Sequence, residues 1–157
     1  MIDRLLTRIG GGFFQQAFVV ADLDAAQRAC VEVLGCSPFV SLPPASLPYW
    51  YRGREIESAL ALGFARSGNV QIELLQPVSG DGVHSDFLET HGPGAHHLGF
   101  MVDHVDDELA ATDFELVQSG RFGSLRFAYL DTWDSLGVYV ELVEDPEEMM
   151  RHLMPWN

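Results

Sequence analysis

The stretch GPGAHHLGFMVDHVD, residues 92–106, combines a glycine-rich turn, a pair of histidines, an alternating apolar run and a helix start. The chain contains a second copy of this pattern. QQAFVVADLD, which begins at Gln15, aligns without a gap with HLGFMVDHVD, which begins at His97. In this alignment Ala17 falls on Gly99, and both segments end in an aspartate. The repeat predicts two related modules, and it therefore decides the expected fold.

The repeat extends to the ends of the two modules. The first closes with VQIELLQP and the second with VYVELVEDP, each with a glutamate among apolar residues, Glu73 and Glu141. Strand and helix patterns between these points predict an α+β fold built from two β-α-β-β-β modules. The predicted parts are module one over residues 13–77, a joint over 78–94, module two over 95–144 and a helical tail over 145–157.

Local signals set the expected limits of individual elements. A capping aspartate before the first helix and Gly35 after it predict a helix that ends at Leu34. The segment PPASLPYWYRG, residues 43–53, is rich in proline and aromatic residues and predicts a long loop. This loop is interpreted either as an aromatic lid over a substrate or as a loop that only packs on the surface. Apolar spacing predicts a second helix over Val105–Val117.

Composition excludes some functions. The chain has 157 residues, enough for one domain, and a formal net charge of −14 at pH 7. Such an acidic balance argues against binding to nucleic acid or to an anionic membrane, because both need a basic surface. All nine basic residues are arginines, so a Schiff-base lysine is excluded. The two cysteines form no paired motif, and the sequence has no signal-peptide or transmembrane pattern, which favours a cytoplasmic protein with reduced thiols.

Four polar residues are expected to share one surface, because strand side chains alternate between two faces. The face opposite the most regular apolar row of each strand carries Gln15, Glu73, His97 and Glu141. Two buried carboxylates need a positive partner, since burying an unpaired charge is costly. A divalent metal held by these four side chains would satisfy both carboxylates. The donor set suits Zn, Co, Mn, Ni, Fe or Mg.

Some alternatives to this assignment stay open. A shift of one residue in the first strand would replace Gln15 by Gln16. A solvent-facing position would explain either glutamate alone, but two glutamates at equivalent places of a repeat favour the metal site. Of the histidine pair, the repeat selects His97 as the ligand. We expect His96 to face the other way and to be packed or hydrogen-bonded behind the site.

These motifs together resemble the vicinal oxygen chelate superfamily, which includes glyoxalases, methylmalonyl-CoA epimerases, bleomycin and fosfomycin resistance proteins, and extradiol dioxygenases. The resemblance lies in AFVVADLDAA (17–26), VLGCSPF (33–39), IELLQP (72–77), the stretch at 92–106 and LGVYVELVE (136–144). It implies a curved sheet of two modules around a shared metal cleft, with ligands at Gln15, Glu73, His97 and Glu141. Gln15 departs from the epimerase branch, which more often has His there. The complete set resembles that of animal glyoxalase I.

The activity implied by the resemblance is metal-dependent proton transfer next to a carbonyl group, as in an isomerase or epimerase. Glu141 is expected to act as both ligand and base, with Glu73 as the symmetric second base and Glu55 and Glu57 as alternatives. Candidates for substrate contacts are Tyr139, Tyr129 and Trp50. The substrate is expected to be small and fairly apolar, or a thioester, although few arginines are available for the phosphates of CoA.

Two other activities are compatible with the same pattern. One is a non-catalytic protein that binds a small molecule, as resistance proteins do. The other, less favoured, is a non-heme iron dioxygenase, which normally uses two histidines and one carboxylate. The resemblance also implies a homodimer. The remaining histidines of the joint and second module, His84, His91 and His104, are expected at the surface or as helix caps.

Overall fold

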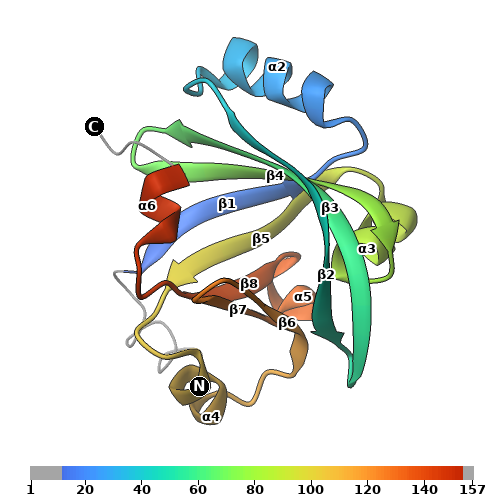
Figure 1. The fold of residues 1–157 in the computed structure, drawn as a ribbon, viewed down its shortest axis with the longest axis vertical. Helices are drawn as coiled ribbons and strands as arrows, with labels where there is room; N and C mark the ends of the chain where they lie inside the picture. Colours follow the sequence, from blue (N-terminus) through green and yellow to red (C-terminus); the bar gives the residue numbers. More distant parts are fainter. Residues whose placement is uncertain (1–11, 154–157) are drawn as a thin grey trace.

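The structure is a computed structural model and describes residues 12–153. Its elements in chain order are β1 (Phe13–Val19), α2 (Leu23–Leu34), β2 (Val40–Tyr51), β3 (Arg54–Ser67), β4 (Val70–Gly80), α3 (Val83–His91), β5 (Gly94–Met101), α4 (Val105–Ala111), β6 (Leu116–Phe122), β7 (Leu125–Leu130), α5 (Trp133–Leu136), β8 (Tyr139–Glu144) and α6 (Met149–Leu153). The strands close into a barrel in the order β1-β4-β3-β2-β6-β7-β8-β5 (Figure 1). The predicted pair of β-α-β-β-β modules is confirmed.

The two modules meet with the symmetry that the repeat predicts. Each module forms four adjacent strands, and the modules join where β1 pairs with β5 and β2 pairs with β6. Across the first junction Gln15 lies opposite Gly99 and Ala17 lies opposite His97. Because the repeat equates Gln15 with His97 and Ala17 with Gly99, the two contacts are equivalent. The modules are therefore related by an approximate twofold axis through this junction.

The helices α2 and α4 cover the outside of the barrel, one for each module (Figure 1). Under α2 the core contains Ile72 and Leu74 of β4, while Glu73 between them faces the interior. The α2 boundaries agree with the sequence. Asp22 accepts a hydrogen bond from the backbone N–H of Ala25 (3.0 Å), and Gly35 ends the helix in the left-handed conformation.

The predicted loop over residues 43–53 is wrong, because most of this segment belongs to β2. It pairs with β3 from Val40 to Tyr51, and the hairpin turns at Arg52 and Gly53, both with positive φ. The adjacent prolines, which lack an N–H to donate, fall where the register shifts between Leu42 and Ala45. A third proline, Pro48, pairs in regular register with Glu57. A strand that contains three prolines looks like a loop in sequence.

The second helix is also shorter than predicted: α4 ends at Ala111, and β6 takes up Val117. The apolar residues predicted too long a helix. Leu109, Phe114 and Leu116 all pack against one core cluster, but only Leu109 is helical. The helical tail begins later than predicted, at Met149, and residues 154–157 lie outside the described residues. Within residues 12–153 no helix has the length and apolar character needed to cross a membrane.

Candidate metal centre

The structure brings the four predicted metal ligands together from four strands, β1, β4, β5 and β8. The three oxygens Gln15 Oε1, Glu73 Oε2 and Glu141 Oε2 lie 3.0, 3.2 and 2.7 Å from Nε2 of His97. All four residues are buried, and none is more than 7% exposed. Glu73, His97 and Glu141 offer ligand atoms within 4.8 Å of one another.

The protein alone does not satisfy this cluster. One imidazole nitrogen carries at most one hydrogen, yet three oxygens approach it. Glu141 Oε2 accepts no well-directed hydrogen bond among the described residues, so its short contact with His97 is an ion pair only. A buried carboxylate oxygen without a donor is costly. A cation would satisfy both carboxylates, and one nitrogen with three oxygens is a donor set that suits a divalent metal.

Gln15, and not Gln16, faces the centre. The Gln15 amide nitrogen donates to Oε1 of the fully buried Gln71 at 2.7 Å, which turns the Gln15 oxygen toward His97. The Gln16 amide instead donates to backbone carbonyls of Ala17 and His97, at 3.1 and 3.4 Å. Gln71 thus has a supporting role that the sequence did not reveal, because glutamines at strand spacing are common on any polar face.

Gly99 leaves the space in which Gln15 lies. A Cβ at residue 99 would lie 2.9 Å from both Cβ and Oε1 of Gln15. We expect Gly99→Ala to destabilise the fold by about 1–3 kcal/mol through overpacking and to weaken metal affinity by displacing the amide. Thermal unfolding and metal titration measure the two effects. Gly94→Ala on the same strand is the control, since its Cβ would meet nothing within 4 Å. Equal losses in both variants would contradict this role.

His96 lies directly behind His97, the predicted ligand. Its Nδ1 is 2.9 Å from Nδ1 of His97, and its ring packs against those of Phe87, Tyr129 and Tyr139. A metal on Nε2 of His97 requires the tautomer with hydrogen on Nδ1, and Nδ1 of His96 would accept that hydrogen. Such a partner orients a metal-bound imidazole and fixes its tautomer.

We expect His96→Phe to lower metal affinity by about 10–100-fold, because the ring is kept but the acceptor is lost. Isothermal titration with Zn²⁺ or Mn²⁺ measures the effect. The unfolding temperature of the metal-free protein serves as the control for packing. An unchanged affinity would show that His96 only fills space.

The two carboxylates and His97 shift one another's pKa values. Burial lowers the pKa of His97, but the Glu141 and Glu73 carboxylates outweigh it and raise this pKa to about 9. Burial raises the pKa of Glu73, Glu141 adds to the shift, and His97 partly offsets it. In the metal-free protein a protonated His97 therefore takes the place that a metal cation would have.

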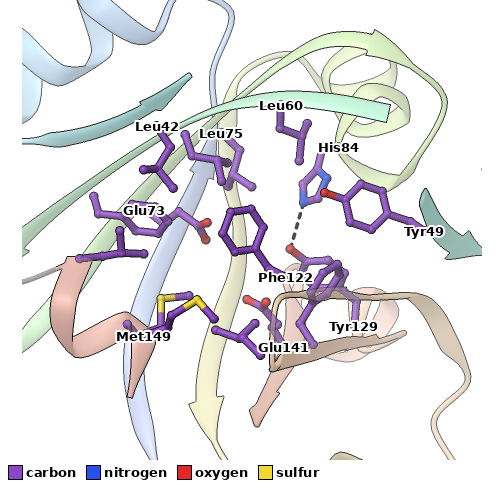
Figure 2. Close-up of a pocket in the computed structure, with 16 residues that line it drawn as sticks. Leu42, Tyr49, Leu60, Glu73, Leu75, His84, Phe122, Tyr129, Glu141 and Met149 are labelled. Carbon is purple, nitrogen blue, oxygen red and sulfur yellow. Dashed lines mark hydrogen bonds between the residues drawn. The ribbon is translucent and has the colours of Figure 1, made fainter. Parts of the chain in front are cut away.

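A pocket opens beside the carboxylates and contains about 630 Å³ of empty space, part of it open to solvent. Figure 2 shows Glu73 and Glu141 extending into it from two sides, with Tyr129 and His84 hydrogen-bonded nearby. Of the predicted substrate contacts, Tyr129 lines the pocket, whereas Tyr139 and Trp50 are not among its lining residues. Trp50 is 44% exposed.

Trp50 lies outside the pocket because it belongs to strand β2. Because residues 49 and 50 of a strand face opposite sides, only Tyr49 reaches the pocket and Trp50 faces outward. The interpretation of residues 43–53 as an aromatic lid over a substrate is therefore wrong, because most of this segment is a strand and not a loop. Glu55 and Glu57, the alternative bases, are exposed and are not among the residues that line the pocket.

His84 is the main site residue that the sequence reasoning missed, since it was expected at the surface. It is 3% exposed, and its Nε2 lies 3.0 Å from the Tyr129 hydroxyl. Helix α3 places it there, anchored where the Val83 N–H donates to Gln118 Oε1 (2.9 Å). Burial and the nearby His97 lower the pKa of His84 to about 3, so the ring is neutral. Burial raises the pKa of Tyr129 well above its usual value, and Glu141 and Glu73 add to the shift, so the hydroxyl keeps its proton.

The sequence matches a known protein family. Residues 14–129 match the glyoxalase/bleomycin resistance protein/dioxygenase superfamily. The chain belongs to this superfamily. A curated relative is the uncharacterized protein YqjC of Bacillus subtilis, which is 30% identical over 95 residues that cover 56% of this chain and 67% of YqjC.

Solved structures show the same fold. Methylmalonyl-CoA epimerase from Mycobacterium tuberculosis is 26% identical with a TM-score of 0.57, covering 85% of this chain and 87% of its own. A Streptomyces coelicolor methylmalonyl-CoA epimerase in complex with 2-nitronate-propionyl-CoA is 22% identical with a TM-score of 0.57, covering 86% and 97%. Hypothetical protein BH1468 from Bacillus halodurans is 19% identical with a TM-score of 0.65, covering 87% and 95%. The two neighbours below 25% identity support the superfamily fold only.

Proposed function

We propose that this superfamily member is a metal-dependent enzyme that moves a proton on the carbon next to a carbonyl group. One observation carries the proposal: three side-chain oxygens approach one imidazole nitrogen beside an apolar pocket. The metal ligands would be Gln15, Glu73, His97 and Glu141. The similarity to the M. tuberculosis methylmalonyl-CoA epimerase supports an epimerase or isomerase over other superfamily chemistries.

In the proposed reaction Glu141 accepts the proton of the carbon. The C–H bond breaks, its electron pair forms the C=C bond of an enolate, and the carbonyl oxygen takes the negative charge. A bound divalent metal would supply positive charge that stabilises this oxygen. The proton returns to the same face from Glu141, or to the other face from a second acid. Glu73 is our candidate for the second acid, because it lines the pocket at the equivalent place in the other module.

Tyr129 would donate a hydrogen bond to the substrate from beside Glu141, its direct partner across β7 and β8. We expect Tyr129→Phe to slow proton exchange by about 10²-fold, because it removes a donor aimed at developing charge. Tyr139→Phe is the matched control, since Tyr139 does not line the pocket. Exchange followed by NMR compares the two. A loss in Tyr139→Phe equal to that in Tyr129→Phe would contradict the assignment.

Solvent deuterium exchange tests the proposed function. The full chain is loaded with Zn²⁺, Co²⁺ or Mn²⁺, its metal content is measured, and it is incubated in D₂O with simple ketones and thioesters. We expect deuterium to enter the carbon next to the carbonyl only with metal-loaded protein. Metal binding without exchange on any carbonyl compound would reject the proposed reaction.

Non-catalytic binding is the second candidate, favoured by the apolar lining of the pocket. It would give ligand binding without exchange, with or without metal. An iron dioxygenase fits less well, because the cluster beside the pocket, Glu73, His97 and Glu141, contains one histidine and two carboxylates. That chemistry normally uses two histidines and one carboxylate. Oxygen uptake by the iron-loaded protein would favour the dioxygenase. The predicted homodimer remains a prediction, and size-exclusion chromatography with light scattering tests it.

A further inference from the structure

The pocket wall beyond the two carboxylates is apolar almost throughout. Eleven of its sixteen lining residues are Leu, Phe or Met, and the remaining five are Tyr49, Tyr129, His84 and the two glutamates. Apolar contact stabilises an apolar ligand in proportion to the area removed from water. The wall therefore favours a hydrocarbon chain over a polar one.

One part of this wall is a short helix near the end of the chain. Met149, Met150 and Leu153 of α6 all line the pocket. The Asp145 carboxylate accepts hydrogen bonds from the backbone N–H groups of Met149 and Met150, both at 2.8 Å, and so fixes the start of the helix. Methionine side chains are flexible and adapt to apolar ligands of different shape. We infer that the apolar part of a ligand lies against α6.

The charges of the pocket have one sign. Among the described lining residues the only charged side chains are the carboxylates Glu73 and Glu141, and no arginine is included. The arginines at 52, 54 and 126 instead contact the exposed or half-buried acids Asp131, Asp81 and Asp106. A divalent ion would only balance the two glutamates. A ligand carboxylate or phosphate would lose its hydration in this pocket without gaining a cationic partner, which is costly.

We propose that the substrate class of this site is an uncharged carbonyl compound with an apolar chain, its carbonyl toward Glu73 and Glu141 and its chain against α6. The orientation of the carbonyl rests on the proposed function, whereas the preference for an uncharged apolar chain rests on the lining alone. The proposed class excludes substrates whose acyl group carries a carboxylate.

Direct binding tests the preference without any need for turnover. The zinc-loaded full chain is titrated by calorimetry with methyl ketones of increasing length, and with keto acids of matched length that carry a carboxylate at the far end. We expect affinity to rise about fourfold for each added methylene until the pocket is filled, and the carboxylate to cancel that gain. Equal affinity for ketones and keto acids, or no dependence on length, would overturn the inference.

A charge inserted at the pocket rim gives a second, independent test. Phe122 lines the pocket and is 42% exposed, so Phe122→Arg places a cation there without burying it fully. We expect this variant to bind the keto acids up to about fivefold more tightly relative to the ketones. Val78→Arg, at a 51% exposed site that does not line the pocket, is expected to leave the ratio unchanged. The same change of ratio in both variants would count against a local effect and against the inference.

Deuterium exchange on the same ketones and keto acids separates this inference from the proposed function. Ketone-selective binding without exchange would support the substrate class and reject the proton-transfer reaction. Exchange at equal rates on ketones and keto acids, with equal affinities, would support the reaction and reject the substrate class.

Discussion

Glu141→Gln is expected to slow metal-dependent proton exchange by about 10³-fold. Glutamine has almost the same shape but cannot accept the substrate proton, and it also removes one anionic metal ligand. Exchange is measured by NMR at saturating metal, so that weaker metal binding alone does not explain the loss. Metal affinity is measured separately by calorimetry.

Glu57→Gln is the control for this substitution, because Glu57 is an exposed glutamate on β3 that does not line the pocket. We expect it to retain full exchange. The unfolding temperature of metal-free Glu141→Gln should fall below that of the parent at neutral pH, since the variant loses the buried ion pair between Glu141 and protonated His97. Substantial exchange in Glu141→Gln at saturating metal would remove Glu141 from the role of base.

The second large effect is a pH dependence of opposite sign in two quantities. As pH rises, the stability of the metal-free protein should fall and the metal affinity should rise. The pKa of His97 is about 9 in the folded metal-free protein, above the ordinary value of 6.5. Its protonation therefore stabilises the fold fully below about pH 6.5, and this contribution is lost as pH rises toward 9. We expect the unfolding temperature of the metal-free protein to fall over this range, which thermal scans at fixed ionic strength measure.

Metal affinity should change in the other direction, because His97 must release its proton before Nε2 binds a metal. We expect about a tenfold gain in affinity per pH unit between pH 7 and 9. At a free metal concentration of 100 times Kd, metal should stabilise the fold by about 2.7 kcal/mol and raise the unfolding temperature by roughly 5–10 °C. An affinity independent of pH, with no proton release in calorimetry in two buffers, would contradict His97 as a ligand.

The sequence predicted the four-residue cluster from two periodic properties. Strand alternation places Ile72 and Leu74 on one face and Glu73 on the other, whatever the rest of the fold does. The repeat then equates Gln15 with His97, so that a pair of modules implies a shared centre. Both signals are local or internal to the chain, and the structure places all four side chains around one nitrogen.

Sequence patterns failed where tertiary contacts override local preference. The prolines of segment 43–53 argue against a strand, yet ten residue pairs with β3 stabilise β2. Phe114 was predicted to continue the second helix, but it lies beyond the end of α4 and packs against the same core cluster as Leu109. In each case the stabilising partner lies in another part of the chain, and the local sequence does not reveal which residues will contact it.

By itself, then, the sequence determined the two modules, their strand faces and the cluster of Gln15, Glu73, His97 and Glu141. The tertiary structure alone decided what surrounds the cluster: Gln71 behind Gln15, His84 beside Tyr129, Tyr49 instead of Trp50, and the methionines of α6 in the wall. For His84 and the methionines the physical reason is that α3 and α6 belong to the joint and the tail, outside the repeat. Where they pack depends on long-range contacts across the barrel, which have no periodic pattern in the sequence.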